Sequence, residues 1–126
     1  MVALYSQLTY TARLMTSLLS GENLMINDPR IKRLAEHYGL DWQCDKLVEE
    51  MAELIVAITH MKKKDENYEK HKENFLEELG DVKILISEVE HLLNPPQKIT
   101  LAESMSYKIN REIERIGEKD AVAEIE

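Results

Sequence analysis

The sequence predicts an all-α fold, and more specifically a helical bundle whose core is completed by oligomerisation. Three observations support this prediction. The 126 residues include only 4 Gly and 3 Pro, apolar residues recur at steps of three and four in several long segments, and no segment alternates between apolar and polar residues as a strand does. A chain of this length forms one domain, and short helical chains often share a core across a subunit interface.

The first part of the chain contains a weak helical pattern and then a strong one. Residues Tyr5 to Leu19 could form a helix. The next predicted helix has both ends marked, because Asp28 can cap it, Pro29 suits its first position and Gly39 can end it. We expect residues 1–24 to be an N-terminal extension, with natural translation starting at Met25. Intact mass of the natively expressed protein tests this expectation.

Three longer helices are predicted downstream. One runs from Trp42 to Met61, with its apolar residues on one side: Leu47, Val48, Met51, Leu54, Ile55 and Ile58. Another covers residues 67–93, with apolar residues at alternating steps of four and three: Phe75, Leu79, Val82, Ile86, Val89 and Leu93. Asn94-Pro95-Pro96 should end that helix.

The last predicted helix begins at Thr100, where Glu103 completes a capping box, and ends at Gly117. Residues 25–117 would then form the helical domain, and residues 118–126 a frayed tail.

Charge and composition exclude several classes of protein. The formal net charge of −8 argues against binding to nucleic acid or to an anionic membrane, since both need a basic surface. No segment approaches the ~18 apolar residues that span a bilayer. The single Cys44 rules out an internal disulfide and favours a reducing compartment. We therefore expect a cytoplasmic protein with no membrane partner.

Two helices each carry a pair of carboxylates three residues apart beside the apolar stripe. Glu50 and Glu53 form one pair, and Glu78 and Asp81 form the other. If these helices pack antiparallel, the four carboxylates converge, and their repulsion requires protonation or a bound cation. Ligands that are all oxygens favour Mg²⁺, with Mn²⁺ second. Gly80, a costly residue in mid-helix, would let a helix or ligand approach closely.

Other interpretations of the acidic residues remain open. A Glu-x-x-Glu pair in an acidic protein is often only a solvated helix face, and such faces would suit a noncatalytic helical module that binds a basic protein. Glu88 and His91 also form one half of a ferritin-like di-iron motif, but no other His of the chain has a Glu three residues before it. We interpret His91 as a cation at a helix C-terminus.

The acidic spacing resembles a known family. "EEMAE", residues 49–53, is followed after 24 residues by "ELGD", residues 78–81. This resembles the E-E-x-x-E and E-x-x-D signature of the MazG-like all-α nucleoside triphosphate pyrophosphohydrolases. The similarity extends from Ile31 to Ile116 and includes the closing "YKINREIERI".

The resemblance implies a Mg²⁺-dependent enzyme that hydrolyses an NTP or dNTP between the α and β phosphates, and that assembles as a homodimer or homotetramer. It implies metal binding by four carboxylates: Glu50, Glu53, Glu78 and Asp81. Glu49 would act with Glu50 in catalysis by orienting or deprotonating the attacking water.

Residues outside the acidic motif are expected to contact the nucleotide. Lys108 and Arg111, with Asn110 between them, would bind phosphate, although both cations could instead form ordinary surface pairs with neighbouring glutamates. Trp42 would stack on a base, or else serve as a packing anchor at the start of its helix. No Gly-rich phosphate loop is present in the sequence, so the fold of P-loop enzymes is excluded.

Overall fold

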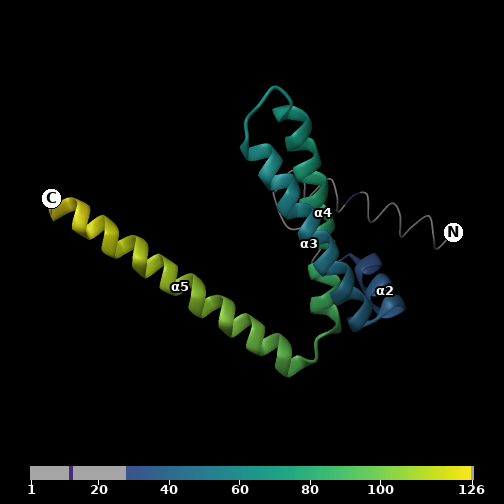
Figure 1. Cartoon of the computed structure of the whole chain (residues 1–126). Helices are drawn as coiled ribbons and strands as arrows, with labels where there is room; N and C mark the ends of the chain where they lie inside the picture. Colours follow the sequence, from purple (N-terminus) through teal and green to yellow (C-terminus); the bar gives the residue numbers. More distant parts are fainter. Residues whose placement is uncertain (1–11, 13–27, 126) are drawn as a thin grey trace. The chain divides into compact units, whose positions relative to one another are not determined.

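Four α-helices follow one another along the part of the chain that the structure describes. The computed structural model describes Ala12 and residues 28–125, with the backbone alone for residues 119–125. The helices are α2 (Pro29–Tyr38), α3 (Leu40–Lys62), α4 (Tyr68–Leu92) and α5 (Pro95–Ile125), with no strand in these ranges (Figure 1). The all-α prediction is confirmed. The predicted helix at residues 5–19 and the proposed start at Met25 lie outside the described residues.

Helix α2 has the two ends that the sequence predicts. The Asp28 carboxylate accepts a hydrogen bond from the Arg30 backbone N–H at 3.0 Å, and Pro29 begins the helix. Gly39 ends it with a φ of +80° and donates its N–H to the Ala35 carbonyl at 2.9 Å. This positive φ favours glycine, and it lets α3 begin at the next residue.

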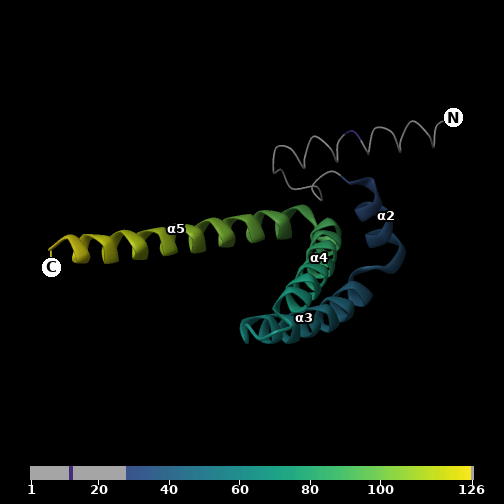
Figure 2. The ribbon, with the colours of Figure 1, turned by 90° about the horizontal axis from the view of Figure 1, so that it is seen from above.

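Helices α3 and α4 form an antiparallel hairpin. The two helices lie side by side in both views (Figures 1 and 2). A short connection joins them, in which the Asp65 carboxylate accepts the Asn67 backbone N–H at 2.9 Å. The predicted helices at residues 42–61 and 67–93 are therefore confirmed to within two residues at each end.

Helix α2 packs against this hairpin near the end of α4. Gln43 is fully buried and donates from Nε2 to the Leu34 carbonyl at 3.4 Å. His91 lies in the last turn of α4, as expected, and its Nε2 lies 3.5 Å from a carboxylate oxygen of Glu36 on α2. The three helices thus form a small bundle.

The buried apolar core is smaller than the sequence pattern predicted. In the described part of the chain, the buried hydrophobic residues are Ile31, Ala35, Ala57, Val82 and Leu85. The predicted apolar side of α3 is divided, since Val48 and Ile55 are 63% and 65% exposed. Completion of the core by oligomerisation stays a prediction, and the large exposed apolar surface supports it.

Glu88 is a buried carboxylate in this small core. It is 4% exposed, and burial raises the pKa of its carboxyl, an effect that a hydrogen bond from Gln43 offsets in part. The folded chain therefore holds this proton to higher pH than the unfolded chain, which releases it near 4.5. Between these two pKa values the folded state binds more protons, so the contribution of Glu88 to stability falls as pH rises.

We expect Glu88→Gln to flatten the pH dependence of stability. The variant should be more stable than the wild type at pH 8, because a neutral amide replaces an ionised buried carboxylate, and about equally stable near pH 4. Urea unfolding at several pH values measures this, with Glu90→Gln as the exposed control. A Glu88→Gln protein that is less stable than wild type at pH 8 would contradict this account.

Helix α5 forms a second compact unit, which begins at Leu93. It starts at Pro95, so the predicted start at Thr100 is wrong. Asn94 and Gln97 form the capping box, since the Asn94 side chain accepts the Gln97 N–H at 2.9 Å and the Gln97 side chain accepts the Asn94 N–H at 2.9 Å. The two prolines occupy first-turn positions, where a backbone N–H has no helical partner in any case.

The other end of α5 also differs from the prediction. The helix continues past Gly117 to Ile125, so the predicted end at Gly117 is wrong. Thr100 lies inside the helix, where its hydroxyl donates to the Pro96 carbonyl at 3.1 Å. Within residues 28–125, no helix is both long and apolar enough to cross a membrane.

Candidate metal centre

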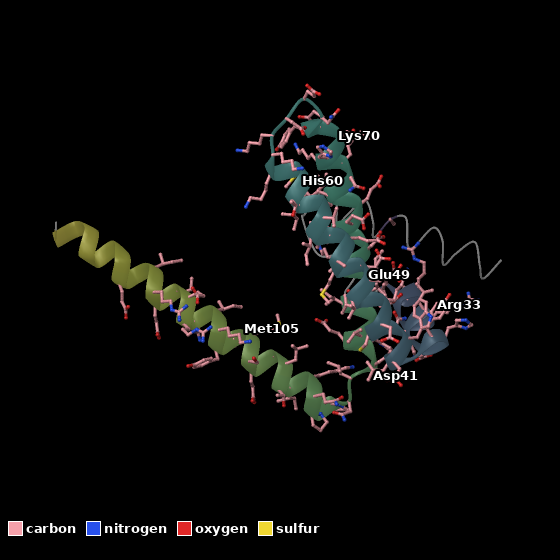
Figure 3. The ribbon with its side chains drawn as sticks, in the orientation of Figure 1. Arg33, Asp41, Glu49, His60, Lys70 and Met105 are labelled. Carbon is pink, nitrogen blue, oxygen red and sulfur yellow. The ribbon has the colours of Figure 1, made fainter. Side chains whose placement is uncertain are left out.

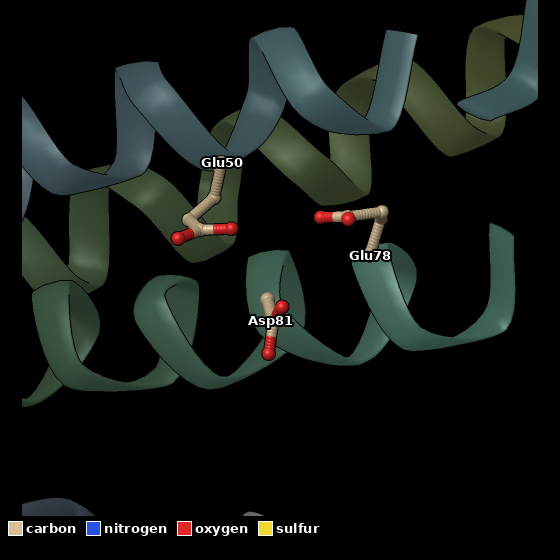
Figure 4. Close-up of side chains that lie close together, drawn as sticks. All are labelled: Glu50, Glu78 and Asp81. Atoms are coloured by element: carbon tan, nitrogen blue, oxygen red, sulfur yellow. The ribbon is translucent and has the colours of Figure 1, made fainter. Parts of the chain in front are cut away.

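The α3–α4 hairpin brings three of the four predicted metal ligands together. Glu50 on α3 faces Glu78 and Asp81 on α4 (Figure 4), and one carboxylate oxygen from each lies within 4.8 Å of the others. Within the described residues, these three side chains form the one cluster of His, Cys, Asp or Glu whose ligand atoms lie close enough together to hold a metal ion. The predicted convergence of carboxylates on the two helices is therefore observed for these three residues.

Helix periodicity explains why these side chains meet. Glu50 lies seven residues after buried Gln43 and seven before buried Ala57, so all three share the α3 face that packs on α4. Glu78 and Asp81 each lie four residues before a buried residue of α4, Val82 and Leu85 respectively. The pattern that packs the two helices also directs the three carboxylates toward one another.

Burial differs among the three carboxylates. Glu50 is 8% exposed, Glu78 is partly buried and Asp81 is exposed. The group thus lies at the edge of the helix interface, with one side open to solvent. A site of this kind can accept a ligand from solution.

Glu78 has a carboxylate oxygen, Oε2, that is buried without a hydrogen-bond donor. Burial raises the pKa of the Glu78 carboxyl, and the negative charges of Glu53, Asp81 and Glu50 raise it further. A buried acceptor without a donor is costly, and a cation would satisfy it.

The donor set fits a hard divalent cation. All three groups are carboxylates, which Mg²⁺ and Mn²⁺ prefer. Two oxygens on one Mg²⁺ lie at most about 4.2 Å apart, because each bond is close to 2.1 Å long. The oxygens here lie within 4.8 Å of one another, and rotation of the exposed Asp81 carboxylate can bring them closer together.

Glu53, the fourth predicted ligand, lies beside the group of three. It is exposed, and its charge contributes to the raised pKa of Glu78. It lies about 60° around α3 from Glu50, and among the neighbouring charges it has the largest effect on the pKa of Glu78. Its role as a direct ligand stays a prediction.

Lys46 is a further residue beside the site, and it was not predicted from the sequence. Its Nζ lies 3.0 Å from the Glu49 carboxylate and 3.2 Å from the Glu50 carboxylate. Hydrogen bonds to Glu49 and then to Glu50 raise the pKa of Lys46. The spacings of three and four residues in "KLVEE" could have indicated this pair of contacts.

Glu49 is exposed and pairs with Lys46, and its catalytic role stays a prediction. Its side chain is 58% exposed, next to Glu50 in the chain, and Lys46 holds it at 3.0 Å. It is therefore accessible to water beside the group of three, without being one of its members.

Gly80 lies between the two α4 carboxylates and has no packing requirement in the structure. A Cβ built at this position meets no atom within 4 Å. The expected close approach of another helix is thus not observed in the described residues. We expect Gly80→Ala to stabilise the protein by about 1 kcal/mol, because alanine favours the helix.

Activity of the Gly80→Ala variant separates a packing role from a ligand role. Thermal unfolding should show a higher Tm for Gly80→Ala than for the wild type. If this stabilised variant also loses turnover, a substrate or a partner approaches Gly80. A lower Tm would contradict the account of this position. Gly117→Ala, on α5, is a helical glycine control with equally open surroundings.

The predicted nucleotide-binding residues belong to two elements, Trp42 to α3 and the others to α5. Trp42, in the first turn of α3, stacks on Tyr38 with ring centroids 3.9 Å apart and planes inclined by 15°. This contact favours the packing-anchor interpretation of Trp42. Its stacking on a base stays a prediction.

Lys108, Asn110 and Arg111 belong to α5, in the second unit. Lys108 and Arg111 share one face of that helix, and the Arg111 guanidinium lies 5.9 Å from the centre of the Tyr107 ring. Asn110 projects from another side, about 100° from Arg111. The Glu112 carboxylate lies 3.8 Å from Arg111 Nε and 2.5 Å from an Arg115 guanidinium nitrogen, so Arg111 forms a surface pair of the kind that the alternative interpretation expects. A phosphate-binding role for these side chains stays a prediction.

No protein-family model, curated protein or solved structure matches this chain. The resemblance to the MazG-like family therefore depends on the acidic motif and the closing basic segment. Membership in that family stays a prediction.

Proposed function

We propose that this protein is a Mg²⁺-dependent pyrophosphohydrolase of nucleoside triphosphates, acting between the α and β phosphates. The observation that carries the proposal is the group formed by Glu50, Glu78 and Asp81, with oxygens within 4.8 Å and a buried, unpartnered Glu78 oxygen. The spacing of these residues in the sequence supports the same activity.

The residues present suit a hydrolysis without a nucleophilic side chain. Water would attack the α phosphorus, its oxygen forming the new P–O bond while the bond to the bridging oxygen breaks and pyrophosphate leaves. Glu49 would accept the proton, and Lys46 would hold the Glu49 carboxylate in place. A Mg²⁺ ion bound by Glu50, Glu78 and Asp81 would polarise phosphate oxygens and offset the charge of the leaving group.

Analysis of reaction products tests the proposal. The purified full-length protein is incubated with a panel of NTPs and dNTPs in Mg²⁺ and in EDTA, and the products are separated by chromatography. We expect a monophosphate and pyrophosphate in Mg²⁺ and neither in EDTA. A diphosphate with inorganic phosphate would show that a different bond is cleaved and would refute the proposal.

The alternative of a noncatalytic interaction module makes a different prediction. Its acidic faces would be solvated, so the protein would neither turn over any nucleotide nor gain stability from Mg²⁺ beyond the effect of ionic strength. The joint absence of both effects would favour that function.

A further inference from the structure

Helix α3 has a second apolar face, opposite the face that packs on α4. At about 100° per residue, Val48, Ala52 and Ile55 lie about half a turn around the helix from Glu50 and Ala57. Val48 is 63% exposed, Ile55 is 65% exposed, and Ala52 is also exposed. Met51 and Val56, at 40% and 54%, border the same stripe. We call the surface formed by these five residues the outer face of α3.

The outer face ends in opposite charges. Asp41 and Asp45 flank it near the start of α3, and Lys62 and Lys63 flank it near the other end. All four side chains are exposed. Asp41 and His60, both labelled in Figure 3, mark the two ends of the helix.

The smallest residue of the outer face lies at its centre. Ala52 is about equally far along the sequence from the acidic end and from the basic end. A small residue at this point lets a second helix approach closely, and a two-fold axis through it would place each acidic end against a basic end. The outer face is therefore complementary to a second copy of itself in the antiparallel direction.

We propose that the outer face of α3 is the contact surface between two copies of this chain, paired antiparallel about a two-fold axis near Ala52. Pairing covers the exposed stripe, which the small core of the α2–α4 unit leaves uncovered. It places Asp41 and Asp45 of each copy near Lys62 and Lys63 of the other. The candidate metal centre is on the opposite side of α3, so the pairing leaves it open to solvent.

Disulfide trapping tests the position of the axis. In Cys44→Ser/Ala52→Cys, the two new thiols lie at the axis, and we expect a covalent dimer under mild oxidation. Native Cys44 should give no such dimer, since in antiparallel pairing Cys44 is displaced by 16 residues from its counterpart, or about 24 Å along the helix. Cys44→Ser/Lys70→Cys, with an exposed thiol on α4, is the control for random collision.

A charge exchange tests the direction of pairing. Asp41→Lys/Asp45→Lys carries two basic ends, and Lys62→Glu/Lys63→Glu carries two acidic ends. Each variant alone should form a dimer with a Kd raised at least roughly tenfold by like charges, and an equimolar mixture should restore dimers. Native mass spectrometry measures the species, and circular dichroism checks that each variant is helical.

Several outcomes would overturn the proposal. The first is a wild-type protein that is monomeric at tens of micromolar. The second is a dimer that persists in both charge variants and that the Ala52→Cys substitution fails to trap. Efficient trapping through Cys44 in the wild type would show parallel pairing instead. None of these outcomes depends on nucleotide hydrolysis, so the proposed function and this surface can fail separately.

Discussion

Glu50→Gln and Asp81→Asn are each expected to lower turnover by more than about 100-fold. Loss of a residue that only supports a metal ligand typically costs 10–100-fold in activity, and loss of a ligand itself should cost more. Each substitution removes one carboxylate from a group whose oxygens lie within 4.8 Å. Steady-state release of pyrophosphate measures the effect.

The fold should tolerate both substitutions. Each replaces a carboxylate with an amide of the same shape and reduces repulsion within the acidic group, so helicity and the Tm measured without metal should be retained or increased. Glu73→Gln, an exposed residue of α4, is the matched control and should leave turnover unchanged. Full activity in both Glu50→Gln and Asp81→Asn would refute the assignment of the site.

Millimolar Mg²⁺ is expected to raise the Tm of the wild type. A ligand present at ten times its Kd stabilises the folded state by about 1.4 kcal/mol. In a domain of this size each kcal/mol raises the Tm by about 4–8 °C, so an increase of roughly 5–10 °C is expected. Differential scanning fluorimetry with and without MgCl₂ measures it.

General screening of the net charge of −8 must be separated from binding at the site. NaCl at matched ionic strength should give a much smaller shift, because salt screens partly buried charges only weakly. Glu78→Gln/Asp81→Asn should abolish the additional effect of Mg²⁺. An equal shift in this variant and in the wild type would mean that the ion acts elsewhere.

The sequence predicted the helices well where capping signals were unambiguous. Asp28, Pro29 and Gly39 mark both ends of α2, and the structure has both. Asn94-Pro95-Pro96 follows the end of α4 as predicted, but the start of α5 was misplaced because the same residues also begin the next helix. The prolines block continuation of α4, while their fixed φ and absent N–H suit the first turn of α5.

The candidate site was predictable in outline because helix periodicity is regular. The spacing of three residues within each pair, together with antiparallel packing of the two helices, predicted that Glu50, Glu78 and Asp81 would converge. The sequence could not separate Glu53 from them, because its distance depends on how the two helices are rotated about their axes. Lys46 was missed because an exposed lysine near glutamates is common and usually contributes little.

Packing within the bundle was the least predictable feature. Gln43 and Glu88 are polar residues that the structure buries, whereas Val48 and Ile55 are apolar residues that it exposes. Apolar periodicity identifies a stripe but not the element that covers it. When a helix is apolar on two faces, the sequence alone cannot assign one face to the chain and the other to a partner.

The most direct test of the central claim is electron paramagnetic resonance of Mn²⁺ titrated with the full-length protein, because it requires no knowledge of the substrate. We predict that the signal of free Mn²⁺ falls with the wild type, returns when excess Mg²⁺ competes, and is unaffected by Glu78→Gln/Asp81→Asn. Equal loss of the signal with the wild type and with this variant, or no loss with either, would contradict a divalent metal centre formed by Glu50, Glu78 and Asp81.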